Sequence, residues 1–301
     1  MTETWQKLLS SHTPSRDPLS IALQSKAQTG RSGAAVGQAV AAGPGWRVVD
    51  IVCTSGPADR PFEERHSPAS ISLVLSGTFV YRGDRGSSLM SPGAFLLGNA
   101  GSPFECSHQH GEGDRCLSFQ FDPELFTALA HDAGASSRSF DRDRLPPLRE
   151  LAPLTARARM AVTGQDSFEE IALELAGAVV SLAGCARRGA SAGAKGDHAR
   201  IARVLREMES RVGQPHPLAD LAHFAGLSRY HFLRTFKGVT GVTPHQWLLR
   251  ARLREAAARL GTSRDPVTRI ALDVGFDDLS NFIRSFRAEF GVSPSRFRAA
   301  A

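Results

Sequence analysis

The chain has 301 residues, of which 42% are hydrophobic and 22% are charged, with 36 basic against 30 acidic side chains. This composition is that of a globular protein and excludes a disordered or fibrous chain, and the length allows two domains with separate cores. Four cysteines are too few and too scattered for a disulfide framework, and no apolar run reaches membrane-spanning length. The acidic N-terminus has no apolar signal segment. We therefore expect a cytoplasmic protein that does not enter a membrane.

The positive charge is concentrated at one end of the chain. Residues 198–301 hold 17 basic and 9 acidic side chains, a net charge of +8, whereas the remainder holds 19 basic and 21 acidic ones. A basic C-terminal third on a near-neutral body predicts a polyanionic partner, because neutralising phosphates releases counterions. A merely soluble basic surface would give the same numbers, so charge alone does not establish DNA binding.

The first part of the chain predicts a tail followed by a β-rich domain. Residues 1–20 mix serine, proline and charge, as poorly ordered tails do. From residue 21 to 128 the pattern is typical of short strands, notably 46–53 and 71–81, with turns at 82–86 and 91–93. We expect the last two strands, 104–110 and 116–121, to form a hairpin around Gly111. Many short strands with regular turns favour a sandwich or small barrel.

A helical segment at 129–186 should follow the β-rich domain. Its best marked helix begins near Ser167 and repeats apolar residues at three- and four-residue spacing from Phe168 to Leu182. That apolar face must pack on the barrel or on the same helix of a second subunit, and the pattern leaves both alternatives open. Residues 187–197 are small and polar and predict a linker.

Residues 218–297 carry the same pattern twice. Ala222–Ser228 leads through a glycine turn to Phe232, Arg234 and Phe236, and Ala271–Phe276 leads in the same way to Phe282, Arg284 and Phe286. The offset is 49 residues up to the glycine and 50 after it. Each copy predicts a helix-turn-helix unit, and two such units on a basic background are typical of a protein that reads DNA.

The helix starts and the core of this region are also predicted. Thr243, Asp265 and Ser293 each stand before a proline and should cap a helix, while Ser228 and Asp277 or Asp278 should cap the second helix of each unit. A stripe from Leu249 to Leu260 predicts a helix that holds the two units apart, with Arg250, Arg252 and Arg259 pointing elsewhere. We expect six phenylalanines in the core: Phe224, Phe232, Phe236, Phe276, Phe282 and Phe286.

Residues 198–299 resemble the DNA-binding domain of the AraC/XylS family of bacterial transcription regulators. The spacing, both glycine turns and the closing Gly291–Arg298 segment carry the resemblance. It implies an all-α domain of seven helices at 198–301 and, together with a weaker N-terminal resemblance to a cupin-like β-barrel with following helices, an α+β protein of two domains. It also implies two recognition helices that enter successive major-groove segments about 34 Å apart. The implied partners are double-stranded DNA, a second copy of the chain, RNA polymerase, and a small-molecule or metal effector.

The resemblance places the recognition helices at 228–237 and 278–290. Phe232 and Phe236 face the core in the first, and Phe282, Phe286 and Phe290 in the second. The candidate DNA-binding residues are Ser228, Arg229, Tyr230, Leu233, Arg234, Lys237, Leu279, Ser280, Asn281, Arg284, Arg287 and Arg296. Arginine can pair with guanine and asparagine with adenine, whereas leucine can only meet a thymine methyl. Lys237, Arg287 and Arg296 are expected on phosphates, which position the protein without specifying sequence.

The N-terminal region more weakly resembles a cupin-like sensor domain, through His66, Leu75–Gly77 and Ser91–Gly93. It departs from the metal-cupin pattern, because no His-x-His precedes Gly77 and Phe104 stands where a histidine is often found. A catalytic metal cupin is therefore not expected, and no catalytic residues are assigned.

A separate group of sulfur and imidazole donors predicts a metal site. Cys106, His108 and His110 alternate along one strand and so share a face, and Cys116 or His66 could supply a further ligand. Such donors suit zinc or copper. Same-face donors lie roughly 6.5–7 Å apart along a strand, so a polar pocket lining is the competing interpretation. A third is a redox pair, because a hairpin centred on Gly111 would place Cys106 opposite Cys116.

Taken together, the sequence predicts a DNA-binding transcriptional regulator whose cupin-like domain senses an effector, dimerises, or does both. The alternatives are a metal- or thiol-responsive regulator and a cupin enzyme fused to a DNA-binding module. An enzyme is not expected, because neither a nucleophile–base pair nor a complete cupin ligand set is present.

Overall fold

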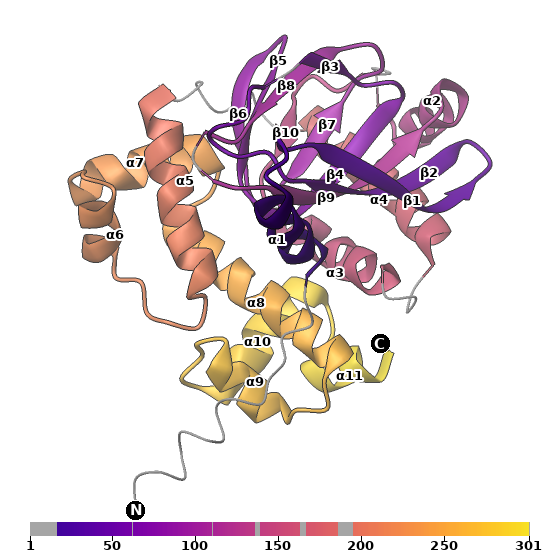
Figure 1. Cartoon of the computed structure of the whole chain (residues 1–301). Coiled ribbons are helices and arrows are strands. Elements are labelled where there is room, and N and C mark those ends of the chain that lie inside the picture. The colour runs from indigo at the N-terminus through magenta and orange to yellow at the C-terminus, as the bar shows by residue number, and fades with distance from the viewer. Residues whose placement is uncertain are drawn as a thin grey trace, which may run out of the picture.

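The computed structural model describes residues 17–61, 63–109, 111–135, 139–162, 167–185 and 195–300. Two parts of the chain are visible in Figure 1, a β-rich part followed by an all-helical part. The first part consists of α1 (Pro18–Thr29), β1 (Ala35–Gly43), β2 (Trp46–Cys53), β3 (Glu63–Arg65), β4 (Ala69–Gly77), β5 (Phe79–Gly83), β6 (Gly86–Met90), β7 (Phe95–Gly98), β8 (Pro103–Ser107), β9 (Asp114–Phe121), α2 (Pro123–Asp132), β10 (Arg144–Leu145), a 3₁₀ turn η1 (Arg149–Leu151), α3 (Ala152–Ala161) and α4 (Phe168–Cys185).

The strands form two sheets that enclose a pocket. The larger sheet has the order β1-β2-β9-β4-β7-β10, and the smaller has the order β3-β8-β5-β6. Side chains alternate across the larger sheet as strand geometry requires. Ile71 and Leu73 on β4 join the main core on one face, whereas Ser70 and Ser72 line the pocket on the other. The larger sheet therefore has one apolar face, which joins the core, and one more polar face, which lines the pocket.

Helices cover the apolar face of the larger sheet. Ile171, Leu175 and Val179 of α4 are buried in the same core as Ile71 and Phe119. Of the two alternatives for this helix, packing on its own barrel is therefore correct. The interpretation of 129–186 as a dimerisation segment loses its basis here, because this apolar stripe is already covered by the chain's own sheet.

Two expectations for the β-rich domain were wrong. The segment that follows the predicted tail is not a strand region, because residues 18–29 form α1, which a proline begins and a left-handed glycine ends. Residues 103–121 do not form a hairpin either. β8 pairs with β3 and β5, whereas β9 pairs with β2 and β4, so the two strands lie in different sheets. When two strands follow each other in the chain, the loop between them does not show whether the two strands pair with each other or with other strands.

The second part is a bundle of seven helices. They are α5 (Lys195–Ser210), α6 (Leu218–Phe224), α7 (Arg229–Thr240), α8 (Pro244–Thr262), α9 (Val267–Asp273), α10 (Leu279–Phe290) and α11 (Pro294–Ala300). The first half of α8 buries Trp247 and Ala251 in a core shared with α5, α6 and α7. Its second half buries Leu253 and Leu260 in a core shared with α9, α10 and α11. One rigid helix therefore joins two small cores, as the apolar stripe predicted (Figure 1).

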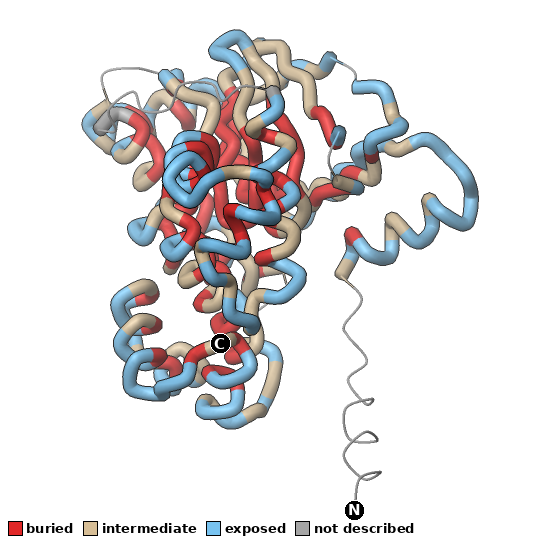
Figure 2. The backbone as a smooth tube through the Cα atoms, turned by 90° about the vertical axis from the view of Figure 1, so that its left-hand side faces the viewer, coloured by how far each residue is buried: buried red, intermediate tan, exposed pale blue. Residues whose placement is uncertain are grey.

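The helical part is docked on the β-rich part. Val80 and Leu89 of the smaller sheet belong to the core of α5–α7, and Ala152 and Ala156 of α3 belong to the core of α9–α11. Figure 2 shows buried positions in both the β-rich part and the helical part. In the described ranges, no helix is long and apolar enough to cross a membrane.

A short segment of the β-rich part ties both halves of the bundle. Arg144 donates to the carbonyl oxygens of Val239 and Thr240 at the end of α7, and Arg149 donates to that of Ala288 near the end of α10. Arginines are favourable there, because the last carbonyls of a helix are unpaired and carry partial negative charge. Residues 144–149 therefore hold equivalent ends of the two helices.

Candidate nucleic-acid interface and sensor pocket

The first helix-turn-helix unit is formed by α6 and α7. Leu221 and Ala222 bury the inner face of α6, and Gly226 makes the turn at φ 66°, a left-handed conformation that favours glycine. Ser228 then caps α7, its hydroxyl accepting from the backbone N–H of His231. The cap fixes where the exposed helix begins.

The second unit repeats the design in α9 and α10. Gly275 turns at φ 91°, where a Cβ would lie 2.6 Å from the carbonyl oxygen of Gly213. Asp278 caps α10 by accepting from the backbone N–H groups of Ser280 and Asn281, at 3.0 and 2.9 Å. Of the two aspartates proposed as caps, Asp278 is the one that caps.

The two exposed faces match position by position at an offset of 50 residues. The exposed residues of α7 are Arg229, Tyr230, His231, Leu233, Arg234, Lys237 and Gly238, and those of α10 are Leu279, Ser280, Asn281, Ile283, Arg284, Arg287 and Ala288. All twelve candidate DNA-binding residues are exposed, including Ser228 and Arg296 outside these lists. The candidate DNA-binding residues omit His231 and Ile283. His231 lies 50 positions before the candidate Asn281, and Ile283 lies 50 positions after the candidate Leu233, so the offset could have identified both.

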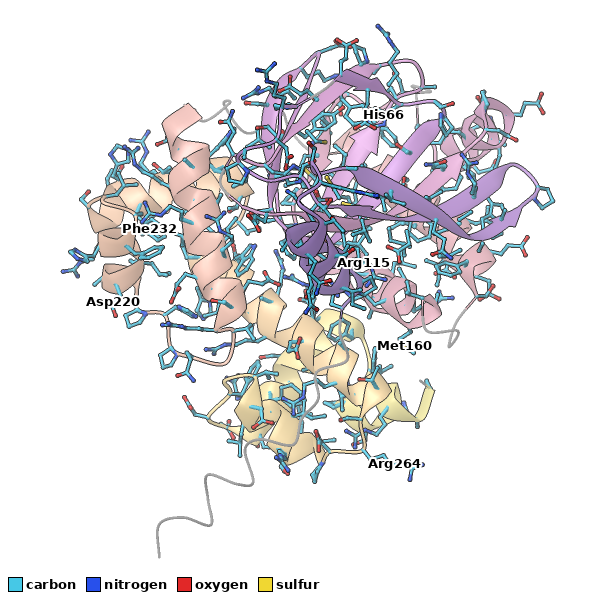
Figure 3. The ribbon with its side chains drawn as sticks, in the orientation of Figure 1. His66, Arg115, Met160, Asp220, Phe232 and Arg264 are labelled. Carbon is cyan, nitrogen blue, oxygen red and sulfur yellow. The ribbon has the colours of Figure 1, made fainter. Side chains whose placement is uncertain are left out.

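The opposite faces of these helices form the cores. Phe232 and Phe236 of α7 and Phe282 and Phe286 of α10 are completely buried, and Figure 3 labels Phe232 inside the first unit. Phe224 contradicts the prediction, because it is 40% exposed and lies 5.1 Å beneath the guanidinium of Arg203. It ends a seven-residue helix, so one side of its ring meets a charged side chain instead of the core.

Charged side chains divide into two groups. Arg234 lies over the Tyr230 ring at 5.8 Å on the exposed face of α7. By contrast, Arg252 donates to the carbonyl oxygens of Val212, Gln214 and Gly275 and so holds the bundle together. Part of the positive charge of residues 198–301 is therefore structural.

One helix start differs from the prediction. α9 begins at Val267 and has no side-chain cap, so Asp265 does not cap it. Its carboxylate instead pairs with Arg259 at 3.3 Å. Thr243 behaves as expected and forms a reciprocal cap with Gln246 at the start of α8.

The pocket between the two sheets has a volume of about 270 Å³. Cys106, His108, Cys116 and His66 all line it, as do Cys53 and Asp114. Cys106 and His108 come from the end of β8 and Cys116 from β9, so the donors approach from different sheets. His110 lies outside the described residues.

His66 is separated from the other donors by its own partners. Its Nε2 lies 3.1 Å from the Tyr81 hydroxyl and its Nδ1 3.3 Å from the Ser70 hydroxyl, and its ring stacks on Phe104. Burial lowers the pKa of His66 to about 4, so the ring is neutral at pH 7. Both of its nitrogens are engaged, which disfavours a role as a metal ligand.

A tighter group forms around His108. Its Nε2 lies 2.5 Å from the Asp114 carboxylate, and one ligand atom each from Cys53, His108 and Asp114 lie within 4.8 Å of one another. Cys116 donates to the other oxygen of Asp114 at 3.3 Å. Burial alone would lower the pKa of His108, but its hydrogen bond with Asp114 and its interaction with the nearby Cys53 raise that pKa to about 9. Burial and Asp114 raise the pKa of the Cys106 and Cys116 thiols well above the usual range.

Cys53 and Asp114 were missed as candidates. They face each other as register partners on β2 and β9, about 60 residues apart in the chain. Only the sheet pairing brings them together, and no local spacing indicates that pairing. The same pairing removes the basis of the predicted Cys106–Cys116 hairpin, and Cys53, Cys106 and Cys116 are free thiols.

The two histidines predict a stability maximum near pH 6.5. The pKa of His108 is raised in the folded chain, so its contribution is complete below pH 6.5 and is lost as the pH rises toward 9. The pKa of His66 is lowered, so below pH 6.5 the unfolded chain binds a proton that the folded chain refuses, and stability falls toward pH 4. Urea unfolding across this range should show both slopes. Asp114→Asn should flatten the alkaline slope alone and His66→Gln the acidic slope alone, whereas unchanged slopes would contradict the assignment.

Comparison with known proteins points to regulators of transcription. A family model described as a helix-turn-helix domain matches residues 221–300. The chain is 38% identical over 95 residues to the transposon Tn10 TetD protein of Escherichia coli, covering 32% of this chain and 69% of that protein. It is 33% identical over 98 residues to the HTH-type transcriptional activator AarP of Providencia stuartii, covering 33% of this chain and 73% of AarP.

A third relative is longer. The MmsAB operon regulatory protein of Pseudomonas aeruginosa is 40% identical over 81 residues, which cover 27% of this chain but only 26% of that protein. The match therefore spans about a quarter of that relative.

Proposed function

We propose that this chain, which belongs to the AraC family of transcriptional regulators, reads one operator with α7 and α10 in successive major-groove segments. The single observation that supports this is the match between the two exposed faces, because seven exposed positions of α7 recur on α10 at an offset of 50 residues. The exposed faces of α7 and α10 are equivalent, and the single helix α8 joins the two units that carry them. Such a pair suits two successive major-groove segments on one face of a DNA duplex.

We assign the contacts by side-chain chemistry. Arg234 and Arg284 pair with guanine, and Asn281 pairs with adenine, since each can make two hydrogen bonds to that base. Leu233, Leu279 and Ile283 meet thymine methyl groups. The basic residues Lys237 and Arg287 in the last turns, together with Arg296, hold phosphates. Ser228 also serves as the cap of α7.

Selection of bound sequences from random DNA, followed by footprinting, tests this function. We expect two blocks of sequence preference whose centres are about one helical turn, 10–10.5 base pairs, apart. A single block, or binding without sequence preference, would contradict a two-helix reading.

We further propose that the pocket between the sheets binds an effector. Ser72 and Ser118 of the larger sheet line it on one side, and Phe104 of β8 in the smaller sheet lines it on the other. The pocket also connects to the DNA-binding part: Leu96 lines it, and its register partner Arg144 holds the end of α7. An effector acts on DNA binding only if it binds the two states with different affinity. We propose regulation rather than catalysis because the relatives are regulators.

The second candidate is a metal effector, favoured by the group Cys53, His108 and Asp114. Sulfur, imidazole and carboxylate donors together suit zinc. Protein purified under reducing conditions and analysed for metal by mass spectrometry is expected to hold zinc in proportion to protein. Cys53→Ser should lose it, whereas His66→Gln, which removes a histidine elsewhere in the same pocket, should retain it. Equal metal contents in the two variants would contradict this site.

The finer partners are proposals as well. We place the protein in the cytoplasm with the DNA and include RNA polymerase among its partners. For homodimerisation we propose the edge strand β1, which lies outermost in the larger sheet and has no charged residue across Ala35–Gly43. Edge strands without charge are prone to pair with another chain. Val36, which is 67% exposed, is the position to test: Val36→Lys should give a monomer in analytical ultracentrifugation.

A further inference from the structure

A cavity at the junction of the two parts of the chain has a volume of about 380 Å³ and is separate from the pocket between the sheets. Its walls come from the end of β4, from α3, from α5 and α8, and from α10 and α11. Figure 3 labels Met160 and Arg115, two of its lining residues, where the β-rich part meets the bundle. A cavity of this size suits a small organic ligand.

Two arginines, one from each part, face this cavity. Arg159 on α3 donates through Nη2 to the carbonyl oxygen of Leu75 at 2.8 Å, and its buried Nε has no partner. Arg254 on α8 lies against Gly93, where a Cβ would come within 2.8 Å of its Nη1, and its buried Nη2 has no partner. Each guanidinium therefore keeps one buried N–H that nothing accepts. A buried donor without an acceptor is unfavourable, so this arrangement favours a ligand.

Neither arginine forms an ion pair with an acid of the described cavity wall, although the negative charge of Glu209 acts on both at longer range. Among the described residues, no carboxylate lies within 4.0 Å of either guanidinium. Glu209 and Glu255 line the cavity, and burial of the Glu209 carboxyl inside it raises the pKa of that group. The third arginine, Arg115, is different, because it already pairs with Asp50 at 2.7 Å and Asp17 at 3.1 Å.

Burial also lowers the pKa of both arginines, and burial together with the nearby charge of Arg254 lowers that of Arg159 to about 10. Two like charges from different parts of the chain are thus held near each other. An anion between them would relieve both the repulsion and the missing hydrogen bonds.

The other lining residues of the cavity indicate what kind of anion would fit it. Leu75, Ala156, Met160, Ala251, Phe290 and Phe297 give it an apolar surface. A guanidinium fork matches the planar geometry of a carboxylate. We propose that this cavity binds a small monocarboxylate with an apolar body, whose head accepts from Arg159 and Arg254 and whose body contacts the apolar wall.

Such a ligand would act on the arrangement of the two parts. Because Arg159 belongs to the β-rich part and Arg254 to the bundle, a carboxylate held by both stabilises the docked arrangement by mass action. This site is additional to the pocket between the sheets and does not depend on which effector that pocket takes.

The test uses the full chain without DNA, so its outcome is independent of the proposed DNA reading. The probe is cyclohexanecarboxylate, with cyclohexanecarboxamide as a neutral control of the same shape and sulfate as a control for charge alone. Calorimetric titration is expected to show binding of the carboxylate in preference to both controls. A carboxylate bound no more tightly than the amide, or a sulfate bound equally well, would overturn the proposal.

Three variants assign the site. Arg159→Met and Arg254→Met should each weaken carboxylate binding roughly 10-fold to 100-fold, because each removes a charge-assisted hydrogen bond. Glu209→Gln should strengthen it several-fold, because it removes a competing negative charge without removing a donor. Circular dichroism and thermal unfolding check that each variant is folded. If Arg159→Met fails to fold, the site is still tested by weaker carboxylate binding in Arg254→Met and stronger carboxylate binding in Glu209→Gln. Weaker binding in Glu209→Gln would contradict the site.

Discussion

Arg284→Ala is expected to lower the affinity for the selected operator roughly 10-fold to 100-fold, the effect of losing one two-point contact with a base, about 1–3 kcal/mol. Arg284 is exposed at the centre of α10, 50 positions after Arg234 on α7. Arg234→Ala should have a similar effect at the other half-site. The measurement is competition binding at fixed salt against operators substituted one base pair at a time, in which each variant should lose preference at one position.

Two controls separate base reading from charge. Arg287→Ala in the last turn of α10 should weaken binding to all sequences about equally and reduce the dependence on salt by about one phosphate contact. Arg264, between α8 and α9, is exposed and lies outside both recognition helices (Figure 3). Arg264→Ala should leave the sequence preference unchanged. If Arg284→Ala lowers specific and non-specific affinity alike, Arg284 contacts phosphate rather than a base.

The helical bundle could be predicted from sequence because its determinants are local. The glycine turns at Gly226 and Gly275, the caps at Ser228 and Asp278 and the phenylalanines four residues apart each act within one or two turns of helix. Because the pattern occurs twice, each of these features in the first helix-turn-helix unit is supported by its counterpart in the second. Where a local rule failed, a tertiary contact prevailed: Asp265 pairs with Arg259 instead of capping α9, and Phe224 meets Arg203 at the surface.

The β-rich part was predictable in its strands but not in their pairing. The strands at 46–53 and 69–77 follow from β-branched residues and turn glycines, yet nothing local shows that β9 lies between β2 and β4. That pairing alone brings Cys53 to Asp114 and separates β8 from β9. Of the candidate metal ligands, His108 therefore lies beside Cys53 and Asp114, two residues that the sequence did not indicate. The junction cavity could not be predicted from the sequence either, because Arg159 and Arg254 lie 95 positions apart and only the tertiary fold brings them to one cavity.

Phe286→Ala is expected to destabilise the second helix-turn-helix core by about 3–5 kcal/mol, the usual loss for a buried phenylalanine. Its side chain is completely buried, and its ring centroid lies 5.6 Å from that of Phe282, 4.5 Å from that of Phe290 and 5.4 Å from that of Phe297. Truncation removes all three ring contacts at once and leaves a cavity beneath the exposed face of α10. Urea unfolding followed by circular dichroism measures the loss.

The matched control is Phe224→Ala, the same change at a phenylalanine that is 40% exposed and meets mainly Arg203. We expect it to cost about 1 kcal/mol or less, because little buried surface is lost. Since α10 can present Arg284 and Asn281 only when its inner face is packed, Phe286→Ala should also weaken operator binding near the temperature at which the second core begins to unfold, whereas Phe224→Ala should not. Equal destabilisation by the two substitutions would show that burial of the phenylalanines does not hold the recognition helix in place.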